Sequence, residues 1–522
     1  MKQVLILLLA SFLYTGSVYG LSQGKTFRLD SDYDSNIPII SYVVDTIRTE
    51  HRIPLWNPYV STGISVLGDP LSGVTYLPYL LPTLFFGVQS GWWVTIGLHA
   101  FMGGVFMWML LRNLLAEKTG FEFATWGGLL YMGVGAFAAR VAAGHIEKVL
   151  SFPWYPLFLL ALLKKDQSKH TAIAIGTILG IVFLTGDVYG VFFMGIFYGV
   201  IGIIRGIRGI RVIGEIGVII AAFIAVAGVK LVPFVIEVAP VIGRYSSFDA
   251  ARGSLHLFYS WLPFVMPLGV TFYDRLFFQH VFGFWYNWYE YYAFIGLPMF
   301  FLIALPKILK RKEVQVLIIL IIVGIMYISR GYPYSILYWM DKYIPVLAWF
   351  RAPQRMYEAL TSIVVALITL CASNFLRPPL ANAKGVAFKN IVFLWGMLGI
   401  TFFVSGYQMT YAVEIPRAAE ENLVQQLRTG DGGDITVATF ACCMQTVLVR
   451  EKIHVINYYY GWRPKGAPRF VTASGDGYDF SPLEWTTPMY IIAPRDMMFG
   501  QYGYEVWFGD EKNVVWRVSI LS

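Results

Sequence analysis

The sequence has few charged residues for its length. Only 14% of its 522 residues are Asp, Glu, Lys or Arg, whereas 57% are hydrophobic and 17% are aromatic. This balance exceeds what a soluble domain needs for its core, so the composition predicts a polytopic α-helical membrane protein. Cysteine is also scarce: Cys371 lies inside an apolar run, and Cys442 and Cys443 are adjacent. Such spacing excludes a disulfide framework and a zinc site.

Several common motifs are missing. The chain has no GKS/T phosphate loop, no GxGxxG and no HExxH motif, and no internal repeat is visible. We therefore do not expect direct use of ATP. The formal net charge of +8 would indicate nucleic acid in a soluble chain. Here Lys and Arg lie in short loops between apolar runs, where they orient membrane helices, so we expect no nucleic-acid partner.

About eleven apolar segments suit a transmembrane helix. Residues 1–20 are the first; they could equally be a cleaved signal peptide, and we favour the retained helix. The other predicted spans are residues 92–111, 123–139, 149–163, 172–185, 188–204, 212–236, 291–305, 314–328, 359–375 and 391–404. Two further apolar stretches, 77–88 and 257–272, are interrupted by prolines, so we expect them to lie at the outer membrane interface.

Basic residues fall in alternate loops of this scheme. They are Arg112 with Lys118, Lys164, Lys165 and Lys169, Arg205, Arg208 and Arg211, Lys307 with Lys310–Lys312, and Arg377 with Lys384 and Lys389. The positive-inside rule places these loops in the cytoplasm. The expected organisation is a first extracytoplasmic loop over residues 21–91, a transmembrane core over 92–406 and an extracytoplasmic region over 407–522. We expect a plasma-membrane location.

The region after residue 406 is more polar. It contains short alternating runs such as DITVATF, VLVREKIHVINYYY, MYIIAPR and NVVWRVSIL, separated by Gly, Pro and Asp turns. This pattern predicts a small, mostly β domain.

The first loop carries alternating aspartates, Asp30, Asp32 and Asp34. Carboxylates close to the hydrocarbon core of a membrane are energetically costly unless they face water, and they are kept there for a function. We therefore interpret this loop as part of the catalytic site of a membrane enzyme. A solvated turn or a helix-capping cluster is the alternative. In an extended segment, Asp32 and Asp34 would point to the same side and could share a divalent cation.

Five blocks carry a resemblance to a known family. After the acidic loop come IPLWNPY with GDPLSGVTYLPYLL, then AGHIEKVLSFPWYPLFLLAL, YEYYAFIGLPMFFL and WFRAPQRMYEAL. Together they resemble the YfhO-type branch of the GT-C superfamily of membrane glycosyltransferases, over most of residues 28–376. The resemblance implies a multi-helix enzyme that moves a monosaccharide from a polyprenyl-phosphate carrier to an acceptor on the outer face, with an acidic residue of the first outer loop as base.

Chemistry assigns roles to the polar residues. An inverting transfer needs a carboxylate to take the acceptor's proton, and we rank Asp32 first, then Asp34 and Asp30. Asp32 is preferred because Asn36 follows one helical turn later and Pro38 should end that polar stretch. If a metal such as Mg²⁺ or Mn²⁺ is used, Asp32 and Asp34 are the expected ligands.

The leaving lipid phosphate needs cationic donors, for which we select Arg351 and Arg355, with Arg140 and Lys148 as a second group. Helix anchoring at the head groups is the alternative for the arginines. The residues predicted to contact sugar or acceptor are His145, Glu290, Tyr291, Trp56 and Asn57.

Two other functions fit part of this pattern. A transporter or flippase of lipid-linked saccharide should have charged or broken helices at mid-membrane in both halves of a repeat, whereas here the polar residues gather on the predicted outer side. A catalytically silent assembly protein is the second alternative. The acceptor, whether glycan, polymer, lipid or protein, is not identified by the sequence.

Overall fold

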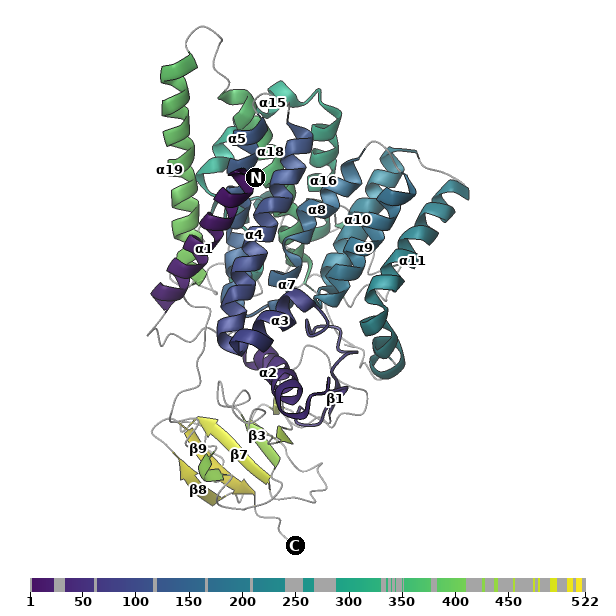
Figure 1. The fold of residues 1–522 in the computed structure, drawn as a ribbon, viewed down its shortest axis with the longest axis vertical. Coiled ribbons are helices and arrows are strands. Elements are labelled where there is room, and N and C mark those ends of the chain that lie inside the picture. The colour runs from purple at the N-terminus through teal and green to yellow at the C-terminus, as the bar shows by residue number, and fades with distance from the viewer. Residues whose placement is uncertain are drawn as a thin grey trace. The chain divides into compact units, whose positions relative to one another are not determined.

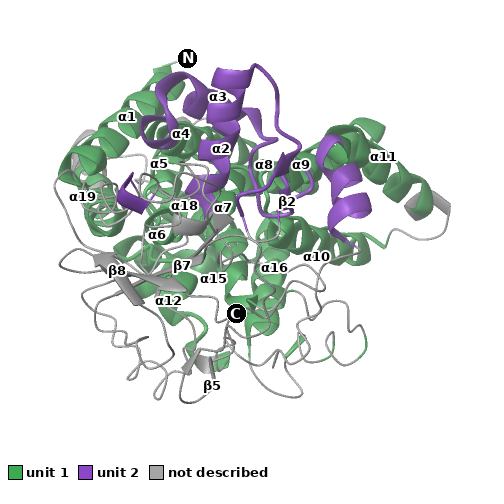
Figure 2. Cartoon of the chain, turned by 90° about the horizontal axis from the view of Figure 1, so that it is seen from below, with its two compact units in different colours: residues 1–25, 93–228, 245–412 green, residues 26–92, 229–244, 413–522 purple. Residues whose placement is uncertain are grey.

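The computed structural model describes residues 2–22, 33–60, 63–115, 120–164, 168–206, 210–239, 257–266, 288–329, 352–376 and 383–409, with short pieces at 335–336, 339, 343, 350, 425–427, 436–439, 454–455, 473–474, 477–478, 489–494, 505–509 and 513–518. The chain forms two compact units (Figure 2). Unit 1 comprises residues 1–25, 93–228 and 245–412, and unit 2 comprises residues 26–92, 229–244 and 413–522.

Unit 1 is built from helices. Their bounds are α1 Lys2–Ser22, α4 Val88–Leu114, α5 Gly120–Met132, α6 Gly135–Ala143, α7 Ile146–Ser151, α8 Trp154–Leu163, α9 Lys169–Leu184, α10 Val188–Ile204, α11 Ile210–Pro233, α12 Leu262–Val265, α14 Trp288–Tyr291, α15 Leu305–Ile308, α16 Lys312–Ile328, α18 Met356–Phe375 and α19 Ala383–Met409. Helices α4 and α11 each continue into unit 2. Short 3₁₀ turns are η2 Leu257–Tyr259, η3 Leu297–Ala304 and η5 Pro353–Arg355.

Six described segments are helical, long and apolar enough to cross a membrane. They are Lys2–Ser22, Val88–Leu114, Ile146–Leu163, Ile213–Val238, Pro353–Phe375 and Val392–Met409. Shorter apolar helices occur at Leu77–Phe86, Lys169–Leu184, Val188–Ile204 and Leu297–Ile308. These helices support the predicted multi-pass membrane protein. The number of eleven spans stays a prediction.

Helix α18 forms the centre of unit 1, and Figure 1 shows it among α5 and α16. All its side chains from Met356 to Ser373 are buried. Its hydroxyl groups are satisfied locally, because Thr361, Ser362 and Thr369 donate to carbonyls three or four residues earlier. The helix therefore tolerates polar residues without contact with water, provided that each finds a partner inside the protein.

Two predicted spans are not continuous helices. The span over residues 123–139 breaks between α5 and α6, and the span over 291–305 begins with non-helical backbone and continues as the 3₁₀ turn η3. The two irregular segments meet: the N–H of Gly135 donates to the carbonyl of Phe294 at 2.7 Å. A Cβ at Gly135 would collide with the Tyr292 ring. Tertiary pairing of buried backbone explains both departures from the hydrophobic pattern.

The first helix packs inside unit 1. Helix α1 contacts α5 and α19, and Figure 1 shows α1 crossing α19. The Ser11 hydroxyl donates to the Gly97 carbonyl at 2.6 Å, and the Tyr14 ring lies edge-on to Phe402. These contacts support a retained helix, which stays a prediction.

Unit 2 contains the part of the first loop that the structure describes. Its elements are α2 Tyr33–Glu50, the pair β1 Trp56–Asn57 and β2 Ile64–Ser65, and α3 Leu77–Phe86. Pro38 and Asp34 both lie inside α2, so the chain does not turn at Pro38 and Asp34 is not in an extended segment. The apolar positions Ile39, Ile40, Val43 and Val44 are buried at helical spacing and carry the helix past the proline.

Helix α3 has the form predicted for residues 77–88. Leu77, Leu81 and Phe85 are exposed at four-residue spacing, whereas Tyr79 and Thr83 on the opposite side are buried. An exposed apolar face suits the expected position at the membrane interface. Nearby in unit 2, the fully buried Lys230 donates to the carbonyls of Pro70 at 3.1 Å and Ser72 at 2.6 Å.

Strands occur where the alternating runs predict them. β3 Thr436–Thr439 pairs in parallel with β4 His454–Val455 and with β7 Met489–Pro494. β9 Asn513–Val518 pairs antiparallel with β7 and with β8 Glu505–Gly509, which gives the order β4-β3-β7-β9-β8. A separate pair joins β5 Ala473–Ser474 and β6 Gly477–Tyr478. The parallel pairing was not predicted, and a mostly β domain over 407–522 stays a prediction.

Candidate functional site

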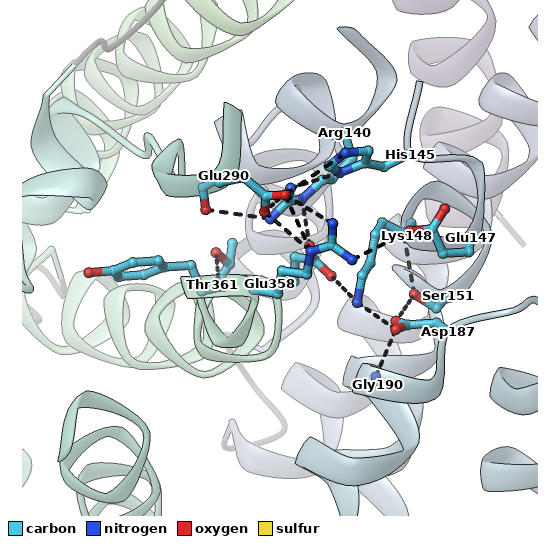
Figure 3. A network of polar contacts seen from close by, with 12 residues as sticks. Arg140, His145, Glu147, Lys148, Ser151, Asp187, Gly190, Glu290, Glu358 and Thr361 are labelled. Atoms are coloured by element: carbon cyan, nitrogen blue, oxygen red, sulfur yellow. Dashed lines mark hydrogen bonds and ion pairs between the residues drawn. The ribbon is translucent and has the colours of Figure 1, made fainter. Parts of the chain in front are cut away.

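A buried network of charged side chains lies in unit 1 (Figure 3). The residues come from segments far apart in the sequence: the end of α6, the start of α7, the residue before α10, the short helix α14, and the junction of η5 with α18. They are Arg140, His145, Glu147, Lys148, Asp187, Glu290, Arg355 and Glu358. We call this set the charged network. Its burial requires that every charge has a partner.

The turn between α6 and α7 brings its first members together. Gly144 has φ of 75°, a left-handed conformation that glycine adopts without steric cost and that ends α6. The N–H of His145 closes the turn by donating to the Arg140 carbonyl at 3.1 Å. Helix α7 begins directly after this turn, so Arg140 lies before the turn and Lys148 lies after it.

Arg140 binds two carboxylates. Its Nη1 lies 2.7 Å from Glu290 Oε2, and its Nε lies 2.5 Å from Glu358 Oε1. Nη1 also donates to His145 Nδ1 at 2.9 Å. Because a guanidinium can only donate, His145 Nδ1 is an acceptor and Nε2 carries the ring proton, directed towards Glu290 Oε1 at 3.9 Å.

Neighbouring charges keep Glu290 and Arg140 ionised. Burial alone raises the pKa of Glu290, but Arg140 and Arg355 outweigh it and hold that pKa well below its usual value. Burial likewise lowers the pKa of Arg140, yet Glu290 and Glu358 raise it overall. A depressed carboxylate pKa means that the stabilisation from Glu290 is present at neutral pH and is lost only as the pH falls through the folded-state pKa.

Lys148 is the centre of a second group of ion pairs in the charged network. Its ammonium lies 2.5 Å from Asp187 Oδ1 and 3.6 Å from Glu358 Oε2, so Glu358 bridges Lys148 and Arg140. Asp187 is the N-cap of α10 and accepts from the N–H of Gly190 at 2.8 Å. Its other oxygen accepts from the Ser151 hydroxyl at 2.6 Å. Figure 3 shows this chain of contacts from Lys148 through Asp187 to Gly190.

Arg355 is the most exposed cation of the charged network. Its side chain is 17% exposed, against 3% for Arg140 and 0% for Lys148. Its Nη2 donates to Glu290 Oε1 at 3.0 Å, and its Nε lies 3.3 Å from both Glu290 oxygens. Its Nη1 lies 3.9 Å from Glu147 Oε1, beyond hydrogen-bond distance. Of the three cations Arg140, Lys148 and Arg355 in the charged network, Arg355 is therefore the best placed to meet a ligand.

The charged network lies at one end of α10, and Arg205, one of the basic loop residues, lies at the other. Helix α10 begins beside Asp187 and ends at Arg205, whose Nη2 donates to the carbonyls of Leu162 and Lys164 at the end of α8. The 17 residues of α10 span about 25 Å, close to the thickness of the hydrocarbon core. The network and the basic loop ends thus lie about one membrane thickness apart.

Comparison with known proteins identifies the fold. No family model matches the sequence, and no curated sequence matches it. The structure is similar to ArnT from Cupriavidus metallidurans bound to undecaprenyl phosphate, with a TM-score of 0.54 at 13% identity over 99% of this chain and 98% of ArnT. It is also similar to the oligosaccharyltransferase AglB from Archaeoglobus fulgidus in complex with an inhibitory peptide and a dolichol-phosphate, with a TM-score of 0.52 at 15% identity over 96% of this chain and 70% of AglB.

These neighbours are GT-C glycosyltransferases. The chain shares the GT-C membrane fold. The fold agrees with the superfamily expected from the five sequence blocks, and membership of that superfamily stays a prediction. The YfhO-type branch stays a prediction.

Within this GT-C fold, five residues selected from the sequence converge. Arg140, His145, Lys148, Glu290 and Arg355 all belong to the charged network. Three members of the network were not selected: Glu147, Asp187 and Glu358. Asp187 lies between two predicted spans, where a solvated turn would be the simplest reading of the sequence, but it is 1% exposed and paired with Lys148. Glu358 adjoins the predicted span 359–375, and an acidic residue beside so apolar a segment was the available signal.

The remaining selected residues are placed differently. Asp30, Asp32 and Arg351 lie outside the described residues, and Asp34 lies in α2. Tyr291 and Asn57 are fully buried, whereas Trp56 is 51% exposed. Asn57 Oδ1 accepts from the N–H of Tyr59 at 3.0 Å. Their contact with sugar or acceptor stays a prediction.

No metal cluster is found in the described part of the chain, where no group of three or more His, Cys, Asp or Glu side chains is arranged to hold an ion. The predicted cation ligands, Asp32 and Asp34, are not covered by that observation. Metal use at the aspartate loop stays a prediction.

Proposed function

We propose that the chain is a membrane glycosyltransferase of YfhO type. It transfers a monosaccharide from a polyprenyl-phosphate donor to an acceptor at the extracytoplasmic face of the plasma membrane. The observation that carries the proposal is the fold, which matches over nearly the whole length a protein bound to undecaprenyl phosphate. A lipid phosphate that leaves from a sugar needs cationic donors at the membrane boundary, and the charged network brings three cations to one end of the helices.

The proposed roles follow the chemistry. Asp32, with Asp34 and Asp30 as the other candidates, takes the proton of the acceptor hydroxyl, and any divalent cation would bind Asp32 and Asp34. Arg355, with Arg351, binds the lipid phosphate through its planar fork of donors. Arg140 and Lys148 are the second group proposed for the phosphate, and both are held in buried ion pairs with Glu358. The extracytoplasmic assignment is supported by the separation of the network from the basic loop ends.

The direct test uses the purified full-length protein in liposomes with radiolabelled monosaccharides on undecaprenyl phosphate and cell-envelope fractions as acceptors. We expect label to leave the lipid only when protein and acceptor are both present. Movement of intact lipid-linked sugar across the bilayer, without cleavage, would instead identify a transporter. Neither cleavage nor movement would favour the assembly-protein alternative.

Topology is tested separately. With the native cysteines replaced, single cysteines at Ser31 and Ser474 should react with an impermeant reagent in intact cells, because the basic loops place both sites outside. A cysteine at Lys165 is the control and should react only after permeabilisation. Labelling of the first two sites only after permeabilisation would refute the proposed orientation.

The phosphate role is tested by Arg351→Ala and Arg355→Ala, each made alone. We expect each to weaken use of the lipid-linked donor by about 10- to 100-fold, since a desolvated charge-assisted contact contributes about 1.5–3 kcal/mol. Arg355→Lys is the matched control, which keeps the charge but loses the fork. Parental activity of both alanine variants at equal expression would exclude this role.

A further inference from the structure

Arg355 is held in one orientation by two different kinds of contact. A guanidinium has five N–H donors in one plane. Glu290 occupies the Nε and Nη2 edge, with contacts at 3.0 and 3.3 Å. The two Nη1 donors make no hydrogen bond to any residue that the structure describes, since Glu147 lies 3.9 Å away. The end of the fork, formed by Nη1 and the second Nη2 donor, can therefore bind two oxygens of a phosphate.

The Arg355 guanidinium lies over the Tyr189 ring. The Arg355 Cζ atom lies 5.0 Å from the centre of the Tyr189 ring, and the Lys148 ammonium lies 4.8 Å from the same centre. Both distances are within the range of cation–π attraction. One ring on the first turn of α10 therefore contacts two cations of the charged network.

Neighbouring rings fix the orientation of Tyr189. Its ring is 9% exposed and lies edge-on to Phe350 at 5.3 Å, with Phe193 at 6.0 Å. Phe350 in turn stacks on Phe192 at 4.0 Å. The aromatic cluster thus holds the Tyr189 ring in place next to the Arg355 guanidinium.

We infer that Tyr189 is a positioning residue for donor binding. It holds the Arg355 guanidinium in place so that the Nη1–Nη2 end of the fork meets the lipid phosphate, while Glu290 holds the opposite edge. The inference rests on the proposed function and extends it to a residue outside the phosphate-binding set. Loss of the ring would leave Arg355 attached to Glu290 by one edge only, free to rotate about that contact.

The experiment measures binding of undecaprenyl phosphate alone to the purified full-length protein in nanodiscs, by native mass spectrometry titration. Tyr189→Leu should raise the dissociation constant by about 5- to 20-fold, because two desolvated cation–π contacts are lost. Tyr189→Phe keeps the ring and should bind within about twofold of the parent.

A double variant separates positioning from a general effect on folding. In the Arg355→Ala background, Tyr189→Leu should cause no further loss beyond about twofold, because its effect passes through Arg355. An undiminished effect in that background, or normal binding by Tyr189→Leu alone, would overturn the inference and leave the proposed function standing. Absence of lipid binding by the parent protein would instead overturn the proposed donor, and the inference with it.

Discussion

Asp32→Asn is expected to lower the turnover of sugar transfer by about a hundredfold or more while donor binding is largely kept. Asparagine preserves the shape of the side chain and most of its hydrogen bonding, but it cannot accept the proton of the acceptor hydroxyl. The loss should therefore appear in kcat rather than in the affinity for the lipid-linked donor. Single-turnover transfer and undecaprenyl phosphate binding, measured on the same preparation, separate the two effects.

Matched substitutions identify which aspartate acts. Asp30→Asn and Asp34→Asn test the other two candidates, and Asp45→Asn, in helix α2, is the acidic control that should keep the parental rate. A shared metal would require both Asp32 and Asp34 and would make transfer sensitive to chelator. Parental rates for all three candidate variants would exclude a catalytic aspartate loop, and transport would then be the better account.

Lys148→Met is expected to lower the free energy of unfolding by about 3–5 kcal/mol, the typical cost of removing one partner of a buried ion pair. The substitution leaves Asp187 and Glu358 without their shared cation in a region where both carboxylates are at most 2% exposed. Thermal and denaturant unfolding in detergent micelles should show the loss, and expression in membranes should fall with it.

The companion variant Asp187→Asn shows whether uncompensated charge is the cause. Asparagine still accepts from the N–H of Gly190 and so keeps the cap of α10. The double variant Lys148→Met with Asp187→Asn should be more stable than the sum of the single effects predicts, because one carboxylate no longer lacks a cation. Strict additivity, or a cost below about 1 kcal/mol for Lys148→Met, would show that the pair contributes little.

The site was predictable where polar residues stand out against an apolar chain. Arg140, His145 and Lys148 are close in sequence between two hydrophobic runs, and Arg355 belongs to a proline-containing polar block at a helix start. Each was selected for the cost of placing charge beside hydrocarbon, which is a local property of the sequence. Their partners were harder to predict, because a pairing such as Arg140 with Glu290 joins residues 150 positions apart.

The sequence by itself indicated a multi-pass membrane protein, the six long apolar helices and the strands β3, β4, β7 and β9, because hydrophobic length and periodicity are local. Only the tertiary structure decided that the helix over 123–139 breaks at Gly133–Val134, that α2 continues through Pro38, and that Asp187 and Glu358 are buried partners of Lys148. Those features depend on long-range contacts. Where packing excludes water, polar backbone groups and charged side chains must find partners inside the protein, as Gly135 does with Phe294. Neither the periodicity nor the composition of the sequence encodes which residue that partner is.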